Sequence, residues 1–212
     1  HPILTPEDMG RIRAANDSDV TCVDLDILFP ADGDGEALEQ SLDAIFREAE
    51  HAILEGATLI ILTDRKMDRH HAAIPALLAA SGLHHYLVRK GLRTSAGIIV
   101  ETGEAREVMH FAMLIGFGVN AICPYTAMST VRYMAEEDLL GTPRDAEKAL
   151  DNYIAAIKKG LLKTFSRMGI STIRSFMGAQ IFQAVGLDQG FVDKYFTRTS
   201  TPIGGAGIGE IA

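Results

Sequence analysis

Short apolar runs alternate with longer amphipathic segments through the first two thirds of the chain. Residues 21–29 alternate apolar and polar side chains, which is typical of a strand with one buried face. Residues 58–64 are apolar on both faces, as expected for a parallel strand that helices cover on each side. Residues 98–100 and 121–125 predict two further short strands.

Apolar side chains recur at helical spacing between these strands. The helices that this spacing predicts cover residues 36–55, 72–90, 104–116 and 126–139. We expect a break at Ser81-Gly82 in the second of them. A threonine cap followed by proline predicts another helix from Thr5, which the polar residues 16–19 end. The alternating order favours an α/β fold with a parallel sheet or a partial, TIM-like barrel.

The pattern changes after residue 143, where no further buried strand is clear. Residues 144–168 predict one long helix, with Gly160 inside it at a cost of about 1 kcal/mol relative to alanine. The remaining elements predicted are a short strand at 171–176 and short helices at 179–185 and 191–196.

Three regions follow from this pattern. Residues 1–143 form the α/β core, and residues 144–198 form a helical extension that packs on it. Residues 199–212 have the glycine-rich composition of a linker. The chain opens with His1-Pro2 instead of Met, so we expect it to be part of a longer protein.

Composition and charge narrow the possible functions. The 212 residues are 47% hydrophobic and carry a net charge of −8, which suits a globular domain and gives no electrostatic reason to bind nucleic acid or an anionic membrane. Cys22 and Cys123 lie in apolar runs, so we expect inert, reduced packing thiols and a cytoplasmic protein.

The most informative segment is residues 91–107, where charged side chains surround one predicted strand. Arg93 precedes the strand, while Glu101, Glu104 and Arg106 follow it. In α/β folds such strand ends often carry the active site. We favour a structural or interface cluster, in which Glu101 pairs with Arg93 or Arg106 and Glu104 stabilises a helix start. Glycine at 103 could expose amides to a phosphate, but the neighbouring glutamate would repel an anion.

An alternative remains open at this point. The strand at 58–64 ends in Thr63 and Asp64 and is followed by Arg65. A stand-alone barrel-like enzyme or ligand-binding domain would use Asp64, Arg93 and Glu101 together, and it requires a concave pocket where these groups converge.

Four histidines could suggest a metal site, at positions 70, 71, 84 and 85. Neighbouring side chains on a helix point about 100° apart, and no acidic residue stands at a metal-binding spacing. We therefore expect solvated histidines. We predict no catalytic, cofactor-binding or metal-binding residue in this chain.

A set of short motifs, in order and at matching spacing, resembles the central domain of the glutamate synthase large subunit. The motifs are PIL (2–4), GLRTS (91–95), VETGEAREV (100–108), HFA (110–112), LIG (114–116), CPY (123–125), KGLLK (159–163), SRMGIST (166–172) and GAQIF (178–182). No single motif is strong, but the ordered set covers nearly the whole chain.

The resemblance implies a place in a larger enzyme. In this family a glutaminase domain precedes the central domain, and an FMN-binding barrel and a β-helix follow it. The enzyme converts glutamine and 2-oxoglutarate into two glutamates, and ammonia travels inside the protein. The central domain would join the glutaminase and FMN domains and help to wall the tunnel, while FMN and the iron–sulfur cluster would lie outside this chain.

Two departures from the family pattern bear on this expectation. The family's nucleophile is an amino-terminal cysteine, and neither Cys22 nor Cys123 is terminal. The family also has an arginine where this chain has Met177, so a charged role there is not expected.

Overall fold

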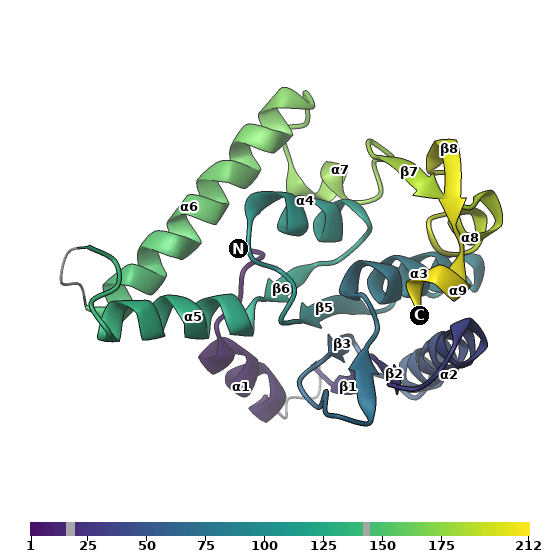
Figure 1. Ribbon diagram of the computed structural model, residues 1–212, viewed down its shortest axis with the longest axis horizontal. Coiled ribbons are helices and arrows are strands. Elements are labelled where there is room, and N and C mark those ends of the chain that lie inside the picture. The colour runs from purple at the N-terminus through teal and green to yellow at the C-terminus, as the bar shows by residue number, and fades with distance from the viewer. Residues whose placement is uncertain (16–19, 142–144) are drawn as a thin grey trace.

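The core is a four-stranded parallel sheet with the order β1-β3-β5-β6 (Figure 1). The computed structural model describes residues 1–15, 20–141 and 145–212. The strands are β1 (Cys22–Asp26), β3 (Leu59–Thr63), β5 (Gly97–Glu101) and β6 (Ala121–Cys123). Ile3 extends the sheet beyond β6 through a parallel bridge to Ile122. The PIL segment is therefore an edge of the sheet.

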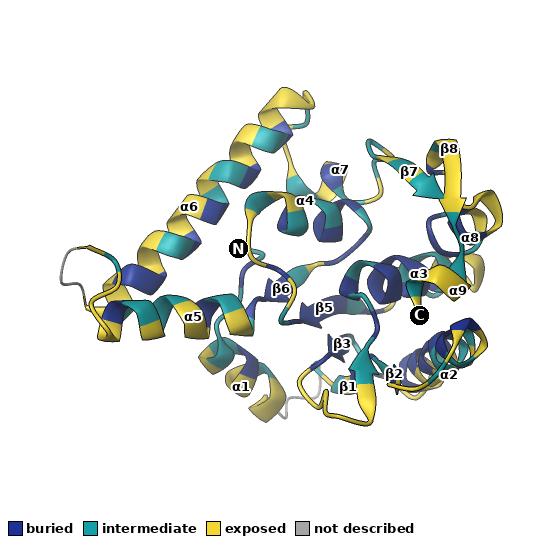
Figure 2. Cartoon of the chain, in the orientation of Figure 1, coloured by how far each residue is buried: buried dark blue, intermediate teal, exposed yellow. Residues whose placement is uncertain are grey.

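Helices cover both faces of this sheet. The connections α2 (Gly35–Leu54), α3 (Ala76–Arg89) and α4 (Val108–Gly116) pack on one face in a continuous apolar core. The short helix α1 (Pro6–Ala14) covers the other face, where its Met9 packs on Ile61 and Ile99. The strands are accordingly buried on both sides (Figure 2). This confirms the expected α/β fold with a parallel sheet.

Two of the predicted elements divide differently in the structure. Residues 21–29 form β1 and then β2 (Leu28–Pro30), which pairs antiparallel with β4 (His71–Ala73) at the start of the predicted 72–90 helix. The expected break at Ser81-Gly82 is wrong, because α3 runs through it. A Cβ atom at Gly82 would lie 2.5 Å from the ring of Phe46. The glycine lets α3 approach α2 closely, as small residues do between helices.

The long helix α6 (Ala146–Arg167) confirms the prediction for most of its length. Its predicted start at residue 144 lies outside the described residues, and Asp145 caps the helix instead. The helix packs against α4 and against α5 (Tyr125–Glu136). Gly160 faces α4, where an added Cβ would lie 2.3 Å from Cγ2 of Val108.

Replacing Gly160 by alanine is expected to destabilise the protein by about 1–2 kcal/mol. Overpacking against a β-branched side chain costs about 1–3 kcal/mol, which exceeds the gain of about 1 kcal/mol in helix propensity. Gly10→Ala is the matched control, since a Cβ at Gly10 in α1 meets nothing within 4 Å. Urea denaturation should show opposite signs for the two variants, and equal stabilisation would disprove the close contact.

The carboxyl-terminal part differs most from the prediction. Its elements are α7 (Ile173–Phe176), β7 (Gln183–Leu187), α8 (Gln189–Tyr195), β8 (Ser200–Ala206) and α9 (Ile208–Ile211). The strand predicted at 171–176 is a helical turn capped by Thr172. The helix predicted at 179–185 is absent: residues 179–182 are a loop, and β7 begins at Gln183. The helix predicted at 191–196 is confirmed by α8.

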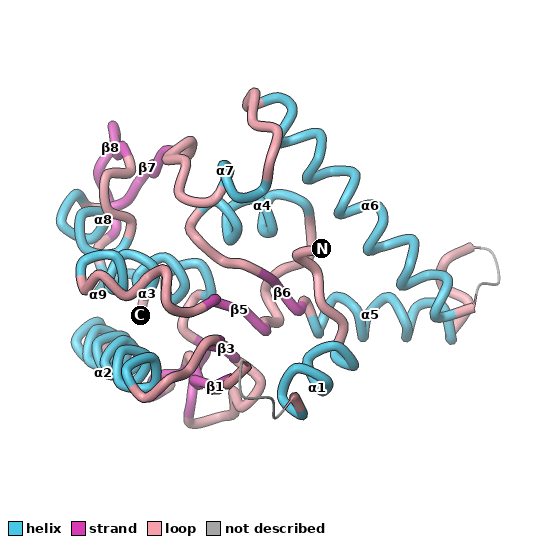
Figure 3. The backbone as a smooth tube through the Cα atoms, turned by 180° about the vertical axis from the view of Figure 1, so that it is seen from behind, coloured by secondary structure: helices cyan, strands magenta, loops and turns pink. Residues whose placement is uncertain are grey.

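The glycine-rich end is ordered in the structure. β8 pairs in parallel with β7, apart from the main sheet (Figure 3). The following α9 packs on the start of α2, where a Cβ at Gly35 would lie 2.7 Å from the Cα of Gly209. Residues 199–212 therefore contain β8 and α9, and their role as a linker stays a prediction. The predicted boundary at 143 falls outside the described residues.

Candidate functional site

The carboxyl ends of the parallel strands bring polar side chains together on the face that α1 covers. Strand register places Asp26, Thr63, Glu101 and Cys123 side by side across the sheet. The end of α1 brings Arg13 into the same region from the start of the chain. The resulting cluster contains Glu101, one of the two buried carboxylates among the described residues.

Glu101 lies at the centre of this cluster and is only 1% exposed. Arg13 Nη2 donates to Oε2 at 2.7 Å, and Arg65 Nε donates to Oε1 at 2.7 Å. The hydroxyl of Thr63 donates to Oε2 at 3.0 Å. Arg13 also holds Asp24, with its Nε 2.9 Å from Oδ2. We call the group Arg13, Asp24, Thr63, Arg65 and Glu101 the arginine clasp.

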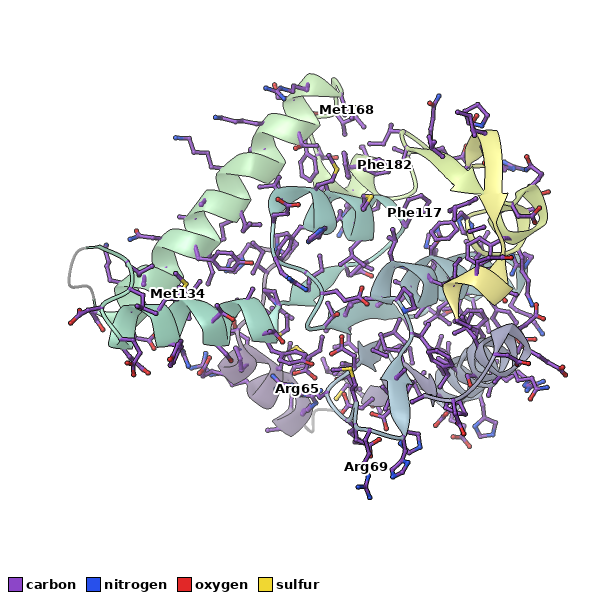
Figure 4. The ribbon with its side chains drawn as sticks, in the orientation of Figure 1. Arg65, Arg69, Phe117, Met134, Met168 and Phe182 are labelled. Carbon is purple, nitrogen blue, oxygen red and sulfur yellow. The ribbon has the colours of Figure 1, made fainter. Side chains whose placement is uncertain are left out.

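Arg65 also contacts an aromatic residue that is not part of the arginine clasp. The Arg65 guanidinium lies over the ring of Tyr125, 4.1 Å from its centroid, in a cation–π contact. Figure 4 labels Arg65 beside α1 and below α5. Arg65 is therefore held between a buried carboxylate and an aromatic ring, which leaves its charge already compensated.

The electrostatics of the clasp keep Glu101 ionised. Burial alone would raise its pKa, but the hydrogen bonds from Arg13 and Arg65 outweigh that effect and lower the pKa below its usual value. A general acid or base at neutral pH needs a pKa near the working pH. A carboxylate shifted away from that range and bound by two arginines is suited to holding the structure together.

The lowered pKa predicts an acid-sensitive contribution to stability. A depressed carboxylate pKa stabilises the fold fully above the unfolded value of about 4.5, and this contribution is lost as the pH falls through the lower folded value. Urea midpoints of the wild type and Glu101→Gln should differ at pH 7 and converge towards pH 3. A constant difference across this range would mean that the charge of Glu101 does not act as described.

A second polar arrangement links the ends of β3 and β5. Asp64, which is buried, accepts hydrogen bonds from the Thr102 hydroxyl at 2.6 Å and from the Gly103 amide at 2.9 Å. Glu104 accepts from the Ala76 amide at 3.0 Å, at the start of α3. Loss of hydration at the Glu104 carboxyl, helped by the charge of Asp64, raises the pKa of Glu104 although the residue as a whole is exposed.

The residues singled out from the sequence do not form one cluster. Arg93 lies at the amino end of β5, where it donates to the Ala96 carbonyl at 2.8 Å and to Asn120 Oδ1 at 3.1 Å. The five residues of β5 span roughly 13 Å, so Arg93 and Glu101 stand at opposite ends of the sheet. The expected pairing of Glu101 with Arg93 or Arg106 is wrong.

Arg106, the other expected partner of Glu101, does not pair with it either. Arg106 is exposed and hydrogen-bonds through its backbone, whose carbonyl accepts from the Tyr153 hydroxyl at 2.9 Å. Asp64, Arg93 and Glu101 do not converge, so the pocket that the alternative enzyme requires is not formed by these three. Sequence reasoning missed Arg13, which is 88 residues from Glu101 and carries no local signal of its partner.

Histidines and cysteines give a mixed outcome. His70 and His71 are exposed, as expected, but His84 and His85 are half-buried, and burial lowers the pKa of each to about 4. Both cysteines are free thiols, and burial raises the pKa of Cys123 to about 12.

Among the described residues, no group of three or more His, Cys, Asp or Glu is placed to hold a metal ion. No helix in the described part of the chain has the length and apolarity of a membrane span.

Residues 1–188 match the family model described as glutamate synthase central domain. The chain is 44% identical over its full length to the large chain of NADPH glutamate synthase from Bacillus subtilis, of which it covers 13%. It is 42% identical to NADH glutamate synthase from Saccharomyces cerevisiae, with 86% of the chain and 9% of that protein covered.

A third relative is a ferredoxin-dependent glutamate synthase from Pyropia yezoensis, 36% identical with 95% of the chain and 14% of that protein covered. The names of the three relatives specify NADPH, NADH and ferredoxin respectively. The chain spans about one seventh of the length of these relatives or less.

Solved structures support the fold at low sequence identity. The flavin-binding domain of baker's yeast flavocytochrome b2 matches with a TM-score of 0.55 and 9% identity, over 83% of this chain and 37% of that one. A mandelate oxidase mutant with an FMN adduct matches with a TM-score of 0.50 and 12% identity, over 80% and 57% respectively. At this identity the likeness concerns the fold alone, and it confirms the barrel-like α/β expectation.

The described residues do not fit a flavin at the carboxyl ends of the strands. Met9 of α1 packs against the face of the sheet where a ligand would lie, and the two clasp arginines are already bound to carboxylates. Asp64 and Glu104 would repel a phosphate from the neighbouring turn. In TIM barrels the phosphate site lies after the last strands of eight, whereas the main sheet described has four.

Proposed function

Because this chain belongs to the glutamate synthase central domain family, we propose that it is a linking domain of a cytoplasmic glutamate synthase. Its role is to hold a glutaminase domain and an FMN-binding domain in register and to form part of the wall of the ammonia tunnel between them. The parent enzyme would convert glutamine and 2-oxoglutarate into two glutamates. Residues 199–212 would lead towards the FMN-binding domain.

The arginine clasp is the observation that carries this proposal. In a catalytic barrel the carboxyl ends of the strands are kept open for substrate and cofactor. Here a helix and two arginines fill that region, and its buried carboxylate is neutralised. An α/β unit with this end closed is suited to a positional role.

Exposed apolar side chains are a second, independent support. Leu162 on α6 is 68% exposed and Met168 at its end is 46% exposed. Figure 1 shows α6 running along one side of the molecule away from the sheet. Leu162 and Met168 are six positions apart, so the two side chains point about 120° apart around the axis of α6 and present apolar surface in two directions. A domain that joins two others needs such faces.

The test compares the chain alone with the complete protein that contains it. The purified chain is expected to release no ammonia from glutamine, to form no glutamate from 2-oxoglutarate and to show no flavin absorbance after incubation with FMN. Either activity, or a bound flavin spectrum, would overturn the proposal.

A variant of the complete protein tests the linking role itself. Leu162→Arg should leave glutamine hydrolysis running while less of the ammonia reaches glutamate, so that free ammonia accumulates. Lys163→Glu changes the charge at the next position of the same helix and is a control for charge alone. Unchanged coupling in the Leu162 variant, with normal folding, would contradict α6 as a docking helix.

A further inference from the structure

A cavity of about 340 Å³ lies at the amino end of the sheet, away from the arginine clasp. Four separate segments form it: the end of α3, the end of α4, the loop after α7 and the loop after α8. Phe117 and Phe182 stack on one wall with their ring centroids 5.8 Å apart. Figure 4 labels both rings, which point towards each other between α4 and the segment before β7. The volume falls in the range of small-molecule sites.

Arg93 contacts His84, a residue of the cavity wall, and no described acidic side chain compensates its charge. It donates to His84 Nδ1 at 2.9 Å, to the Ala96 carbonyl, to the Gly118 carbonyl and to Asn120 Oδ1. All four acceptors are neutral, and no described carboxylate pairs with it. Burial accordingly lowers the pKa of Arg93. A half-buried cation without a counter-charge favours an anion nearby.

The contact with Arg93 fixes the tautomer of His84. A guanidinium nitrogen only donates, so Nδ1 of His84 must accept and the proton of the neutral ring must sit on Nε2. Nε2 faces Gly178 across the cavity, 4.0 Å from where a Cβ of that glycine would lie. Burial and the charge of Arg93 lower the pKa of His84 to about 4, so this arrangement holds at neutral pH. His84 thus offers one N–H donor to the cavity.

The mouth of the cavity carries further donors and no acid. Arg89 and Arg198 line it, and none of the described lining residues is Asp or Glu. Arg89 Nη1 donates to the Thr197 hydroxyl at 3.3 Å, while Arg198 makes no ion pair with any described residue. Thr199, which also lines the cavity, is 8% exposed.

Backbone strain gathers at the same place. Only three described residues other than glycine have positive φ angles, and two of them, Gln180 at 53° and Arg198 at 66°, line this cavity. Such conformations cost about 1–3 kcal/mol each and cluster at ligand sites. The strain here sets the directions of two polar side chains at one cavity.

We propose that this cavity is a binding site for a small organic anion, with its carboxylate or phosphate group held by Arg89, Arg198 and the Nε2–H of His84. The apolar body of the ligand would lie against Phe117 and Phe182. Arginine binds both kinds of anion through paired N–H donors. The site is distinct from the linking role and does not depend on it.

Calorimetric titration of the full chain with phenyl phosphate, benzoate and inorganic phosphate tests the proposal. We expect saturable binding of at least one aromatic anion, tighter than that of inorganic phosphate because of the phenylalanine wall. Arg198→Gln and Arg89→Gln should each weaken binding by about tenfold or more. Arg69→Gln removes a charge from the far side of the molecule (Figure 4) and should leave the affinity unchanged.

The two aromatic probes separate the ligand classes. Tighter binding of phenyl phosphate assigns the site to phosphate esters, and tighter binding of benzoate assigns it to carboxylates. The ¹⁵Nε2 resonance of His84 should shift on binding in the wild type, which a purely structural histidine would not show. No saturable binding of either probe up to about 10 mM, or an equal loss in the Arg69 variant, would overturn the proposal.

Discussion

Replacing Glu101 by glutamine is expected to lower the free energy of unfolding by about 3 kcal/mol at pH 7. The substitution keeps the shape but leaves Arg13 and Arg65 facing each other without their shared carboxylate. Removing one partner of a buried ion pair costs about 3–5 kcal/mol. The two arginine side chains are 32% and 40% exposed, so water screens part of the loss and the low end of that range applies.

The control for this variant is Glu107→Gln, which makes the same chemical change at the surface. The Glu107 side chain is 74% exposed, and its nearest cationic partner, His110, lies 3.7 Å away. Its loss should change stability by less than about 0.5 kcal/mol. Urea denaturation at pH 7 measures both variants. Equal small effects would show that the arginine clasp does not hold the fold together.

Replacing Gly118 by alanine is expected to destabilise the protein by about 3 kcal/mol. Gly118 has a φ of +101°, which a side chain adopts only with strain, and its Cβ would lie 2.1 Å from Nδ1 of His84. Strain of this kind costs about 1–3 kcal/mol, and overpacking adds about 1–3 kcal/mol. The His84 ring would have to leave its contact with Arg93.

Gly56→Ala separates the two causes. Gly56 has a nearly identical φ of +104°, but a Cβ there meets nothing within 4 Å. It should therefore cost only the backbone term of about 1 kcal/mol. The difference between the two variants in urea denaturation measures the packing against His84. If both lose the same stability, that packing contributes nothing.

Much of the fold could be predicted because local patterns carry it. The strand at 58–64 is apolar on both faces, which predicts a strand covered by helices on each side. The helix at 36–55 has a full apolar stripe, which predicts a helix that packs on the core. The carboxyl-terminal part lacks such patterns. β7 is a strand because β8 pairs with it from further along the chain, which a local reading of residues 179–185 cannot detect.

Glycine positions show a second limit of local reasoning. At Gly82 the sequence predicts a helix break, and at Gly160 a plain loss of helix stability. In the structure each glycine lies where another element approaches too closely for a Cβ, namely Phe46 and Val108. The identity of the facing residue is information about tertiary packing, which the spacing along one helix does not contain.

Only some residues of the candidate site could be predicted from the sequence. The sequence marks Glu101 and Asp64 as strand-end carboxylates, and the register of parallel strands brings them to one edge. The partner of Glu101 from the start of the chain, Arg13, is fixed by how α1 folds back over the sheet. Arg93 precedes β5 and Glu101 ends it, so the strand holds the two side chains at opposite ends of the sheet.

The way α1 closes the sheet has a consequence for synthesis on the ribosome. Ile3 pairs with Ile122, and Arg13 with Glu101, so these two residues must wait for partners that are made roughly a hundred residues later. At about 5–20 residues per second this interval lasts roughly 5–20 seconds. During it Ile3 and Met9, both fully buried in the finished domain, face water or a chaperone. The segment that holds Ile3 is therefore the last part of the sheet to pair, although it leaves the ribosome before the strands that it pairs with.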